Sequence, residues 1–494
     1  MEEKQLEQLA RSKPLDSIQQ PEYSAKDFAS PVTDTFLRAF ATGSVLIDCP
    51  RITVRQLAEK KPQVFNGRGM LSLLAGEEFQ LRMYVNDDCI DQHHPIEEFL
   101  RMAQCVSGEV IPPEEYFELS ATDISGFEWS CGKIQAKIHG GCHGIVITGR
   151  LIDVLRHRMS GLTATLPSLM SMFFFDNLQI PFNQFVLTQS TSGERTLSSK
   201  ILPEFARFDA GDFHFEIQKA EPEKGSTILR VSSSIQSLPD GIETRVEESL
   251  RYLTLNPIHW CIVDKRVGDT REVAIVPRRV AQSPIFDEPL DHSRQDCAVD
   301  FWRLFVAYFQ HVVSHPEPQN YHPLSAQLFH VISAETRQLD LLGLLVSVAV
   351  EGVLNCEFAD LAKPSDVFKT SLDQIGKSIR RLRCADAKLA ARLQGVLTPM
   401  KSSRPKDKLK VLEDTGVITK DMVKKWEKLR NTTAHAAVRV DPAETQAMLT
   451  QCYIVYTMLN RLIFQAIGYS GKYQDFSTLG WPIEEFKAPS VSVA

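Results

Sequence analysis

The sequence predicts an α+β protein in which a β-rich N-terminal region is followed by an all-α C-terminal region. Between about residues 40 and 290, apolar and polar side chains mostly alternate, which is typical of half-buried strands. From about residue 298 onward, apolar residues recur every three or four positions, as on amphipathic helices. The chain has 494 residues, more than one hydrophobic core usually serves, so we expect more than one domain.

Predicted strands in the N-terminal region are rich in Val, Ile, Phe and Thr and are separated by Gly, Pro, Asn or Asp. They cover residues 44–48, 79–85, 133–138, 144–150, 184–189, 213–219, 227–233 and 271–277. Two helices are expected among them, at residues 95–106 and 149–159. The region contains neither a phosphate-binding P-loop nor a nucleophile elbow, so a sensing or regulatory role is left to it by elimination.

Helices are predicted along the whole C-terminal region. They cover residues 298–314, 323–336, 338–356, 365–383, 386–397, 405–414, 419–437 and 442–467. Two helix starts carry capping signals: Thr419 begins one helix, and Asp441 followed by Pro442 begins the next. Gly468 is a helix stop. Such a run of helices predicts a bundle.

The polar stretch 283–297 separates the two regions, so we expect a polar segment at 1–40 and domains at 41–297 and 298–494. The first thirty residues contain no apolar run, which predicts that no signal peptide is present. The longest apolar stretch, 341–350, is too short to span a bilayer and predicts a buried helix. Ten scattered cysteines without a C-x-x-C pair indicate free thiols, and we expect a cytoplasmic protein without a membrane partner.

Charge is distributed unevenly along the chain. Segment 377–440 contains seventeen Lys or Arg and six Asp or Glu, a net charge of +11, so the remainder carries −18 of the total −7. A basic segment on an acidic protein indicates a polyanion site, although a solvated, lysine-rich helical face has the same composition.

Within this segment stands KKWEKLRNTTAHAAVRV, residues 424–440. On a helical wheel one stripe faces the bundle core, and it consists of Met422, Trp426, Leu429, Thr433 and Ala436. Arg430, Asn431 and His435 lie off this stripe and therefore point toward solvent or another subunit.

These three residue types suit metal-free cleavage of RNA. Arg binds phosphate in a bidentate fork, His moves a proton near neutral pH, and Asn can hold the imidazole or a phosphate oxygen. A base would take the proton of the ribose 2′-OH, and that oxygen would attack the adjacent phosphorus to give a 2′,3′-cyclic phosphate. Two copies related by two-fold symmetry would supply a fuller site. The spacing of Arg430 and His435 alone is weak, since an ordinary helix surface also contains such pairs.

The stretch WEKLRNTTAHA resembles the R-N-x-x-x-H signature of the HEPN superfamily. The likeness extends to LLGLLVSVAVEGVLN, an apolar helix that carries Glu351, and to the tail at 468–482. The combination is most similar to large bacterial anti-phage HEPN proteins of the ApeA type and covers roughly residues 320–482. The resemblance implies a helical bundle that acts as a metal-independent ribonuclease, without a cofactor, at a homodimer interface.

Carried over by this resemblance, Arg430 and His435 would be the catalytic pair and Asn431 the polar residue after the arginine. Glu351 would orient Arg430, or else is a solvated charge. The resemblance also implies abortive infection, with tRNA as a candidate substrate and a phage-derived trigger acting on the N-terminal region. The basic segment would contact RNA phosphates through Lys377, Arg380, Arg381, Arg383, Lys406, Lys408 and Lys410.

Two alternatives remain open. The bundle could be a non-catalytic HEPN module that dimerises and binds RNA or a nucleotide, in which case His435 would be dispensable. His139, Cys142 and His143, with Cys131 as a fourth ligand, could instead hold zinc in an N-terminal enzyme. A glycine hairpin with polar decoration is the favoured interpretation of these last residues.

Overall fold

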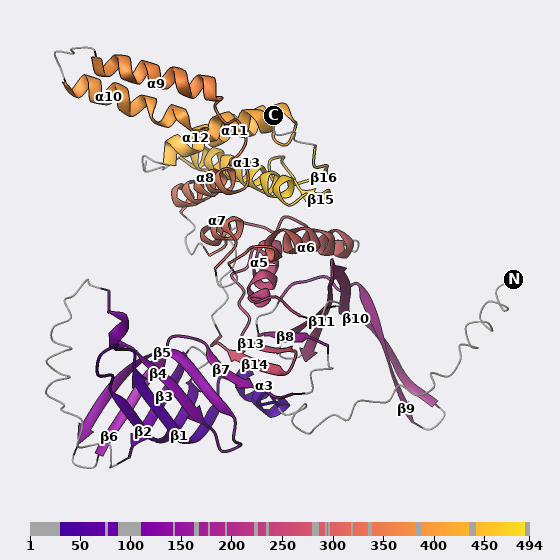
Figure 1. The fold of residues 1–494 in the computed structure, drawn as a ribbon. Helices are drawn as coiled ribbons and strands as arrows, with labels where there is room; N and C mark the ends of the chain where they lie inside the picture. Colours follow the sequence, from indigo (N-terminus) through magenta and orange to yellow (C-terminus); the bar gives the residue numbers. More distant parts are fainter. Residues whose placement is uncertain are drawn as a thin grey trace.

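The computed structural model describes residues 30–489, apart from several internal segments. Those outside the description are residues 75–77, 87–109, 142–143, 163–166, 176–177, 193–194, 222–225, 234–236, 279–285, 292–293, 295–296, 318–319, 334–337, 382–386 and 434–440. The protein is mixed α and β, with a β-rich N-terminal region and a helical C-terminal region, as predicted (Figure 1).

A six-stranded antiparallel barrel forms the first part of the chain. Its strands are β1 (Leu46–Gln56), β2 (Val64–Leu74), β3 (Glu78–Val85), β4 (Phe117–Thr122), β5 (Glu128–Gly141) and β6 (Gly144–Leu151). The order is β4-β1-β2-β3-β6-β5, and β4 also pairs with β5, which closes the barrel. The alternation that predicted β3 is real: Phe79, Leu81 and Met83 are buried, whereas Arg82 and Tyr84 face solvent. Helix α3 (Asp34–Ala41) adds Phe40 to the barrel core.

Beyond the barrel the same sheet continues as an open layer. Its strands are β7 (Leu155–Met159), β8 (Leu169–Phe174), β9 (Gln184–Ser192), β10 (Arg195–Ala210), β11 (Phe213–Glu221), β12 (Ser226–Ser233), β13 (Ile262–Val267) and β14 (Thr270–Ile275). The order is β7-β14-β13-β8-β12-β11-β10-β9, and β7 pairs with β5 of the barrel. The barrel and the open layer are therefore one continuous fourteen-stranded sheet.

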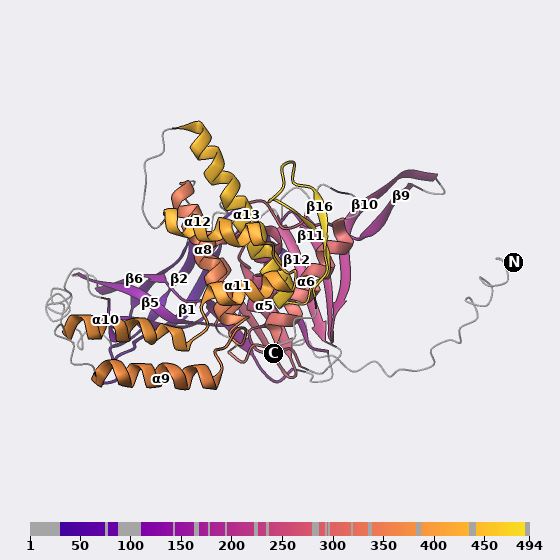
Figure 2. The same ribbon diagram turned by 90° about the horizontal axis from the view of Figure 1, so that it is seen from above.

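The helices lie above the open layer in the view of Figure 1, and α5 and α6 are nearest to it (Figures 1 and 2). They are α5 (Ile242–Thr254), α6 (Cys297–Val313), α7 (Pro323–Ile332), α8 (Leu339–Cys356), α9 (Asp366–Arg381), α10 (Ala387–Leu397), α11 (Pro405–Asp414), α12 (Lys420–Thr433) and α13 (Pro442–Ala466). Two one-turn 3-10 helices, Pro113–Glu115 and Pro399–Lys401, and a small hairpin of β15 (Gly471–Gln474) and β16 (Ile483–Phe486) complete the described elements.

The expected helix ends are confirmed at the atomic level. Thr419 caps α12, because its hydroxyl accepts a hydrogen bond from the backbone N–H of Met422 at 3.3 Å. Asp441 caps α13 in the same way, through the N–H of Ala443 at 2.9 Å. Gly468 follows α13 with a φ of +68°, the left-handed conformation that glycine adopts without strain.

The helix predicted at 149–159 is wrong. The chain there completes β6 and then forms β7, in which Leu155 and His157 are buried while Arg156 and Arg158 face outward. Leu151 and Leu155 lie four residues apart, and this spacing imitated a helical face. The helix predicted at 95–106 lies outside the described residues.

Helix α5 was not predicted. Nearly all its side chains are buried, including the charged residues Arg245, Glu247, Glu248 and Arg251, so it shows no polar face. Paired charges make this burial possible: Arg245 Nη1 lies 2.7 Å from Glu248 Oε1, and Arg251 Nη2 lies 2.8 Å from Glu247 Oε1. Its apolar residues Ile242, Val246, Leu250 and Leu253 do recur at helical spacing, so the sequence carried a signal for this helix that was missed among the surrounding strands.

The hydrophobic cores do not divide where the sequence suggested a boundary. Helix α6 begins at Cys297, next to the expected boundary at 297/298, yet it packs directly on the open sheet. Phe208 stacks on Trp302 with ring centroids 4.5 Å apart, and Phe215 meets Phe305 at 5.3 Å. The open layer and the helices therefore share one core, and the barrel has its own.

Among the described residues, one helix is long and apolar enough to cross a membrane: α8, with a mean hydropathy of 1.8. Leu342, Val346, Val350 and Val353 of this helix lie in the shared core, which agrees with the predicted buried helix.

Candidate functional site on helices α8 and α12

Arg430 on α12 and Glu351 on α8 form an ion pair across the two helices. The Nε atom of Arg430 contacts Glu351 Oε1, and its Nη2 donates to Oε2 at 3.4 Å. The guanidinium carbon also lies 5.9 Å from the centre of the Trp426 ring, within cation–π range. The Arg430 side chain remains 53% exposed, whereas that of Glu351 is 23% exposed. Glu351 thus fixes the direction of a guanidinium that still faces solvent.

The packing of α12 explains how this pair is brought together over 79 residues of sequence. Met422, Trp426 and Leu429 are buried as the helical wheel predicted. The indole N–H of Trp426 donates to the backbone carbonyl of Ser347 on α8 at 3.3 Å. This hydrogen bond fixes the position of α12 along the axis of α8. Arg430, one turn after Trp426, then lies opposite Glu351, one turn after Ser347.

His435, the second member of the predicted pair, lies outside the described residues, as does Ala436. Helix α12 is described to Thr433, and Asn431 faces solvent in its last turn. The structure therefore brings Arg430 and Glu351 together and leaves the position of His435 relative to them a prediction.

Most of the predicted RNA-binding cations lie on the surface. Lys377, Arg380 and Arg381 are exposed on α9, which projects from the bundle together with α10 (Figures 1 and 2). Lys406 and Lys410 are exposed on α11, and Lys406 Nζ lies 2.7 Å from Glu427 Oε1. Arg383 lies outside the described residues.

Lys408 is an exception, and its prediction as an RNA contact is wrong. Its side chain is 3% exposed, and its ammonium donates to the carbonyl of Leu354 at 3.0 Å and to Asn355 Oδ1 at 3.3 Å. Burial lowers the pKa of Lys408 from its ordinary value. Since Leu354 is in the last turn of α8, the lysine satisfies a carbonyl at the negative end of that helix.

The zinc candidates of the N-terminal region do not meet in the described part of the barrel. Cys131 is buried inside it, and its thiol points to the carbonyls of Lys133 and Asp153. His139 faces outward and shares a 3.0 Å hydrogen bond with Thr148. A register shift in β5 before Ile134 turns the two residues to opposite faces, so Cys131 cannot join His139 in one site. Cys142 and His143 lie outside the described residues.

No protein-family model matches the chain. No curated protein and no solved structure matches it either. The likeness to the HEPN superfamily therefore rests on the motif around Arg430, on the apolar helix that carries Glu351 and on the tail at 468–482.

A broad groove with a volume of about 600 Å³ lies on the outer face of the barrel. Arg82, Lys137 and Arg150 line it, and Arg150 Nε pairs with Glu78 Oε2 at 2.7 Å. It lies on β1, β2, β3, β5 and β6 and shares no residue with the Arg430 site. The groove lies in the N-terminal region, for which the sequence analysis predicts a sensing or regulatory role by elimination.

Proposed function

We propose that the protein is a metal-independent endoribonuclease of the HEPN type that acts as a homodimer in bacterial anti-phage defence by abortive infection. The observation that carries the proposal is the Arg430–Glu351 pair. It presents a half-exposed, oriented guanidinium on a helix whose sequence continues into the R-N-x-x-x-H motif. An oriented cation beside a titratable imidazole is what cleavage at phosphorus requires.

In this mechanism His435 accepts the proton of a ribose 2′-OH, and the oxygen forms a bond to the adjacent phosphorus. The bond from phosphorus to the 5′-oxygen breaks, and that oxygen takes a proton from the imidazolium of His435 and leaves as a hydroxyl. Arg430 stabilises the charge on the non-bridging oxygens, and Glu351 holds the guanidinium so that no reorientation is needed in the transition state. The products are a 2′,3′-cyclic phosphate and a 5′-hydroxyl end.

An apolar stripe on α8 supports assembly of two copies next to this site. Leu341 is 40% exposed and Val348 54% exposed, with half-buried Leu345 between them. The stripe ends one turn before Glu351, so a second copy packed on it would lie beside Arg430. Closure of such a pair by two-fold symmetry would place two copies of the motif close together.

The substrate would be held by exposed cations of α9 and α11, with tRNA as the candidate that the resemblance suggests. A phage-derived trigger would act on the N-terminal region, where the barrel groove is the candidate contact. The rival function is a non-catalytic HEPN module that dimerises and binds RNA through the same basic surface. It needs neither His435 nor an oriented Arg430.

The test is expression of wild type, His435→Ala and Arg430→Ala in bacteria, with and without phage challenge. Growth is followed, and the ends of RNA fragments are mapped. We expect discrete fragments with cyclic-phosphate ends in the wild type and none in either variant. Lys428→Ala is the matched control, because it removes an exposed positive charge from the same helix outside the motif.

Equal RNA patterns in wild type and His435→Ala, with phage resistance retained in both, would favour the binding module over the nuclease. Loss of cleavage in Lys428→Ala to the same extent as in Arg430→Ala would show that general charge, not the motif, is responsible.

A further inference from the structure

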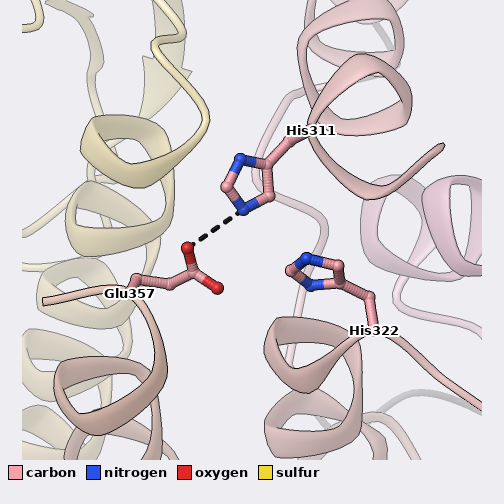
Figure 3. A group of neighbouring side chains, drawn as sticks. All are labelled: His311, His322 and Glu357. Atoms are coloured by element: carbon pink, nitrogen blue, oxygen red, sulfur yellow. Dashed lines mark ion pairs between the residues drawn. The ribbon is translucent and has the colours of Figure 1, made fainter. Parts of the chain in front are cut away.

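A second group of side chains lies where three helix ends meet, away from the Arg430 pair. His311 comes from the last turn of α6, His322 directly precedes α7, and Glu357 directly follows α8 (Figure 3). One ligand-type atom from each of the three lies within 4.8 Å of the others. His311 Nε2 is 3.0 Å from Glu357 Oε2. Two imidazoles and one carboxylate are thus aimed at a common point.

We propose that His311, His322 and Glu357 form a binding site for one divalent transition-metal ion, with zinc as the expected occupant. Two nitrogens and one carboxylate oxygen match the donors that zinc takes, whereas Mg²⁺ and Ca²⁺ prefer oxygen ligands alone. Three protein ligands leave the fourth position of a tetrahedral ion to water. The imidazole ring of His315 lies near the group as well, with its centre 5.0 Å from that of His322.

The protonation states suit a metal. Burial, followed by the nearby His311, lowers the pKa of His322 to about 4, so its imidazole is neutral at physiological pH. Burial alone would raise the pKa of Glu357, but the neighbouring His311 lowers it below its ordinary value and keeps the carboxylate charged. His311 Nε2 is buried and lies 3.0 Å from Glu357 Oε2, so a metal ion would come between these two groups and replace each as the partner of the other.

The surroundings hold two of the three ligands in place. The backbone N–H of His322 donates to Glu248 Oε1 on α5 at 2.8 Å, and Glu248 is itself paired with Arg245. Glu357 takes its position from the end of α8, where its backbone N–H donates to Val353. Ligand atoms around a tetrahedral zinc lie about 3.4 Å apart. The His311–Glu357 pair at 3.0 Å must therefore open slightly, and the longer separations, which reach up to 4.8 Å, must shorten by up to about 1.4 Å, within reach of side-chain rotation.

Binding has one structural cost. His322 Nδ1 accepts the backbone N–H of Leu324 at 3.1 Å and so caps α7. A metal at Nε2 moves the ring hydrogen to Nδ1 and displaces this bond. The first turn of α7 must therefore rearrange when the ion binds.

The experiment uses the full chain, stripped with a chelator and then dialysed against Zn²⁺, with the bound metal measured by mass spectrometry. We expect the wild type to bind one more ion per chain than the ligand variants do. His311→Ala and Glu357→Gln should each lose that equivalent or bind it at least tenfold more weakly. Cobalt added to the stripped wild type should give visible absorption bands of a four-coordinate ion, and both variants should lose them.

His322→Asn is the conservative third variant, because an asparagine oxygen can keep the cap on α7 while the metal ligand is lost. His330→Ala removes an exposed histidine of the same helix and should bind as the wild type does. Circular dichroism verifies that each variant is folded. Retention of the wild-type metal content and cobalt spectrum by the folded ligand variants would overturn the proposal. So would a wild type that takes up no ion. Neither outcome depends on RNA cleavage, so this site and the proposed nuclease can fail separately.

Discussion

At the scale of single residues, Arg430 is defined by what holds it. The arginine is placed between the carboxylate of Glu351 on α8 and the indole ring of Trp426, one turn earlier on its own helix. The exposed side of the guanidinium is the part that can meet a phosphate. Its chemistry therefore depends on a fixed fork and not on charge alone.

Arg430→Lys tests this dependence. Lysine keeps the positive charge but cannot contact both Glu351 oxygens and a phosphate together, so we expect RNA cleavage to fall about a hundredfold. RNA affinity, measured by filter binding, should change by less than threefold. Comparable loss of binding and cleavage would assign Arg430 to substrate binding.

Glu247 offers a pH test at the same scale. Burial alone would raise the pKa of Glu247, but its hydrogen bond with His259 and the charge of Arg251 lower it. Since the folded pKa is below the unfolded value of about 4.3, the ionised carboxylate contributes stability above that pH and loses it as pH falls further. We expect urea unfolding to show that the wild type loses stability as the pH falls below about 4.3. Glu247→Gln should be less stable than the wild type at pH 7, and its unfolding free energy should depend less on pH below about 4.3. Parallel curves would contradict this account.

At the scale of elements, the helices of the C-terminal region were predictable and several strands were not. Helix α11 has the predicted limits and α6, α8 and α13 differ by a residue or so, because each pairs a regular apolar face with clear end signals. The missed strands are β2, β4, β8, β10, β13, β15 and β16, and β7 was predicted as a helix. Helix α5 was missed although its apolar residues follow helical spacing. Local patterning indicates where a helix forms, but it does not tell which charged residues of that helix will be buried by tertiary partners.

The same limit applies to the candidate sites. Motif spacing identified Arg430, and the wheel identified its buried neighbours on α12. His311, His322 and Glu357 are eleven and thirty-five residues apart, on three helix ends, so no linear signature marks them. Lys408 was assigned to the surface because it stands among exposed cations, and only packing shows that it is the one turned inward.

Lys408 and Lys410 make a matched pair of variants. Lys408→Ala leaves the Leu354 carbonyl without its donor, so we expect a loss of about 1–3 kcal/mol in unfolding free energy. Lys410→Ala removes an exposed charge and should leave stability unchanged while reducing RNA affinity and its salt dependence. Thermal unfolding and binding at two salt concentrations measure both. Equal melting temperatures for the two variants would show that the buried contact is worth little.

At the scale of the whole molecule, two cores lie along one sheet, and the proposed dimer surface is on the helical side. Val348 is the exposed centre of the α8 stripe. We expect Val348→Glu to convert a dimer to a monomer in light scattering and to abolish RNA cleavage without lowering the melting temperature. Val299→Glu, at a 64% exposed position on α6, is the control and should stay dimeric. A wild type that is monomeric at the working concentration, or a dimeric Val348→Glu, would exclude this surface.

The continuity of the sheet through β5 limits how the barrel and the rest of the chain can be separated by domain recombination. β5 pairs with β4 and β6 to close the barrel and also with β7, which begins the open layer. A gene fusion that moved the barrel alone would leave β7 without its β5 partner. The unpaired backbone groups of β7 would then form an exposed sheet edge, on which chains can aggregate. We therefore expect recombination to transfer the barrel together with the open layer and the helices, not by itself. A related protein that gained a new N-terminal sensor would have to add it beyond the barrel, not in place of it.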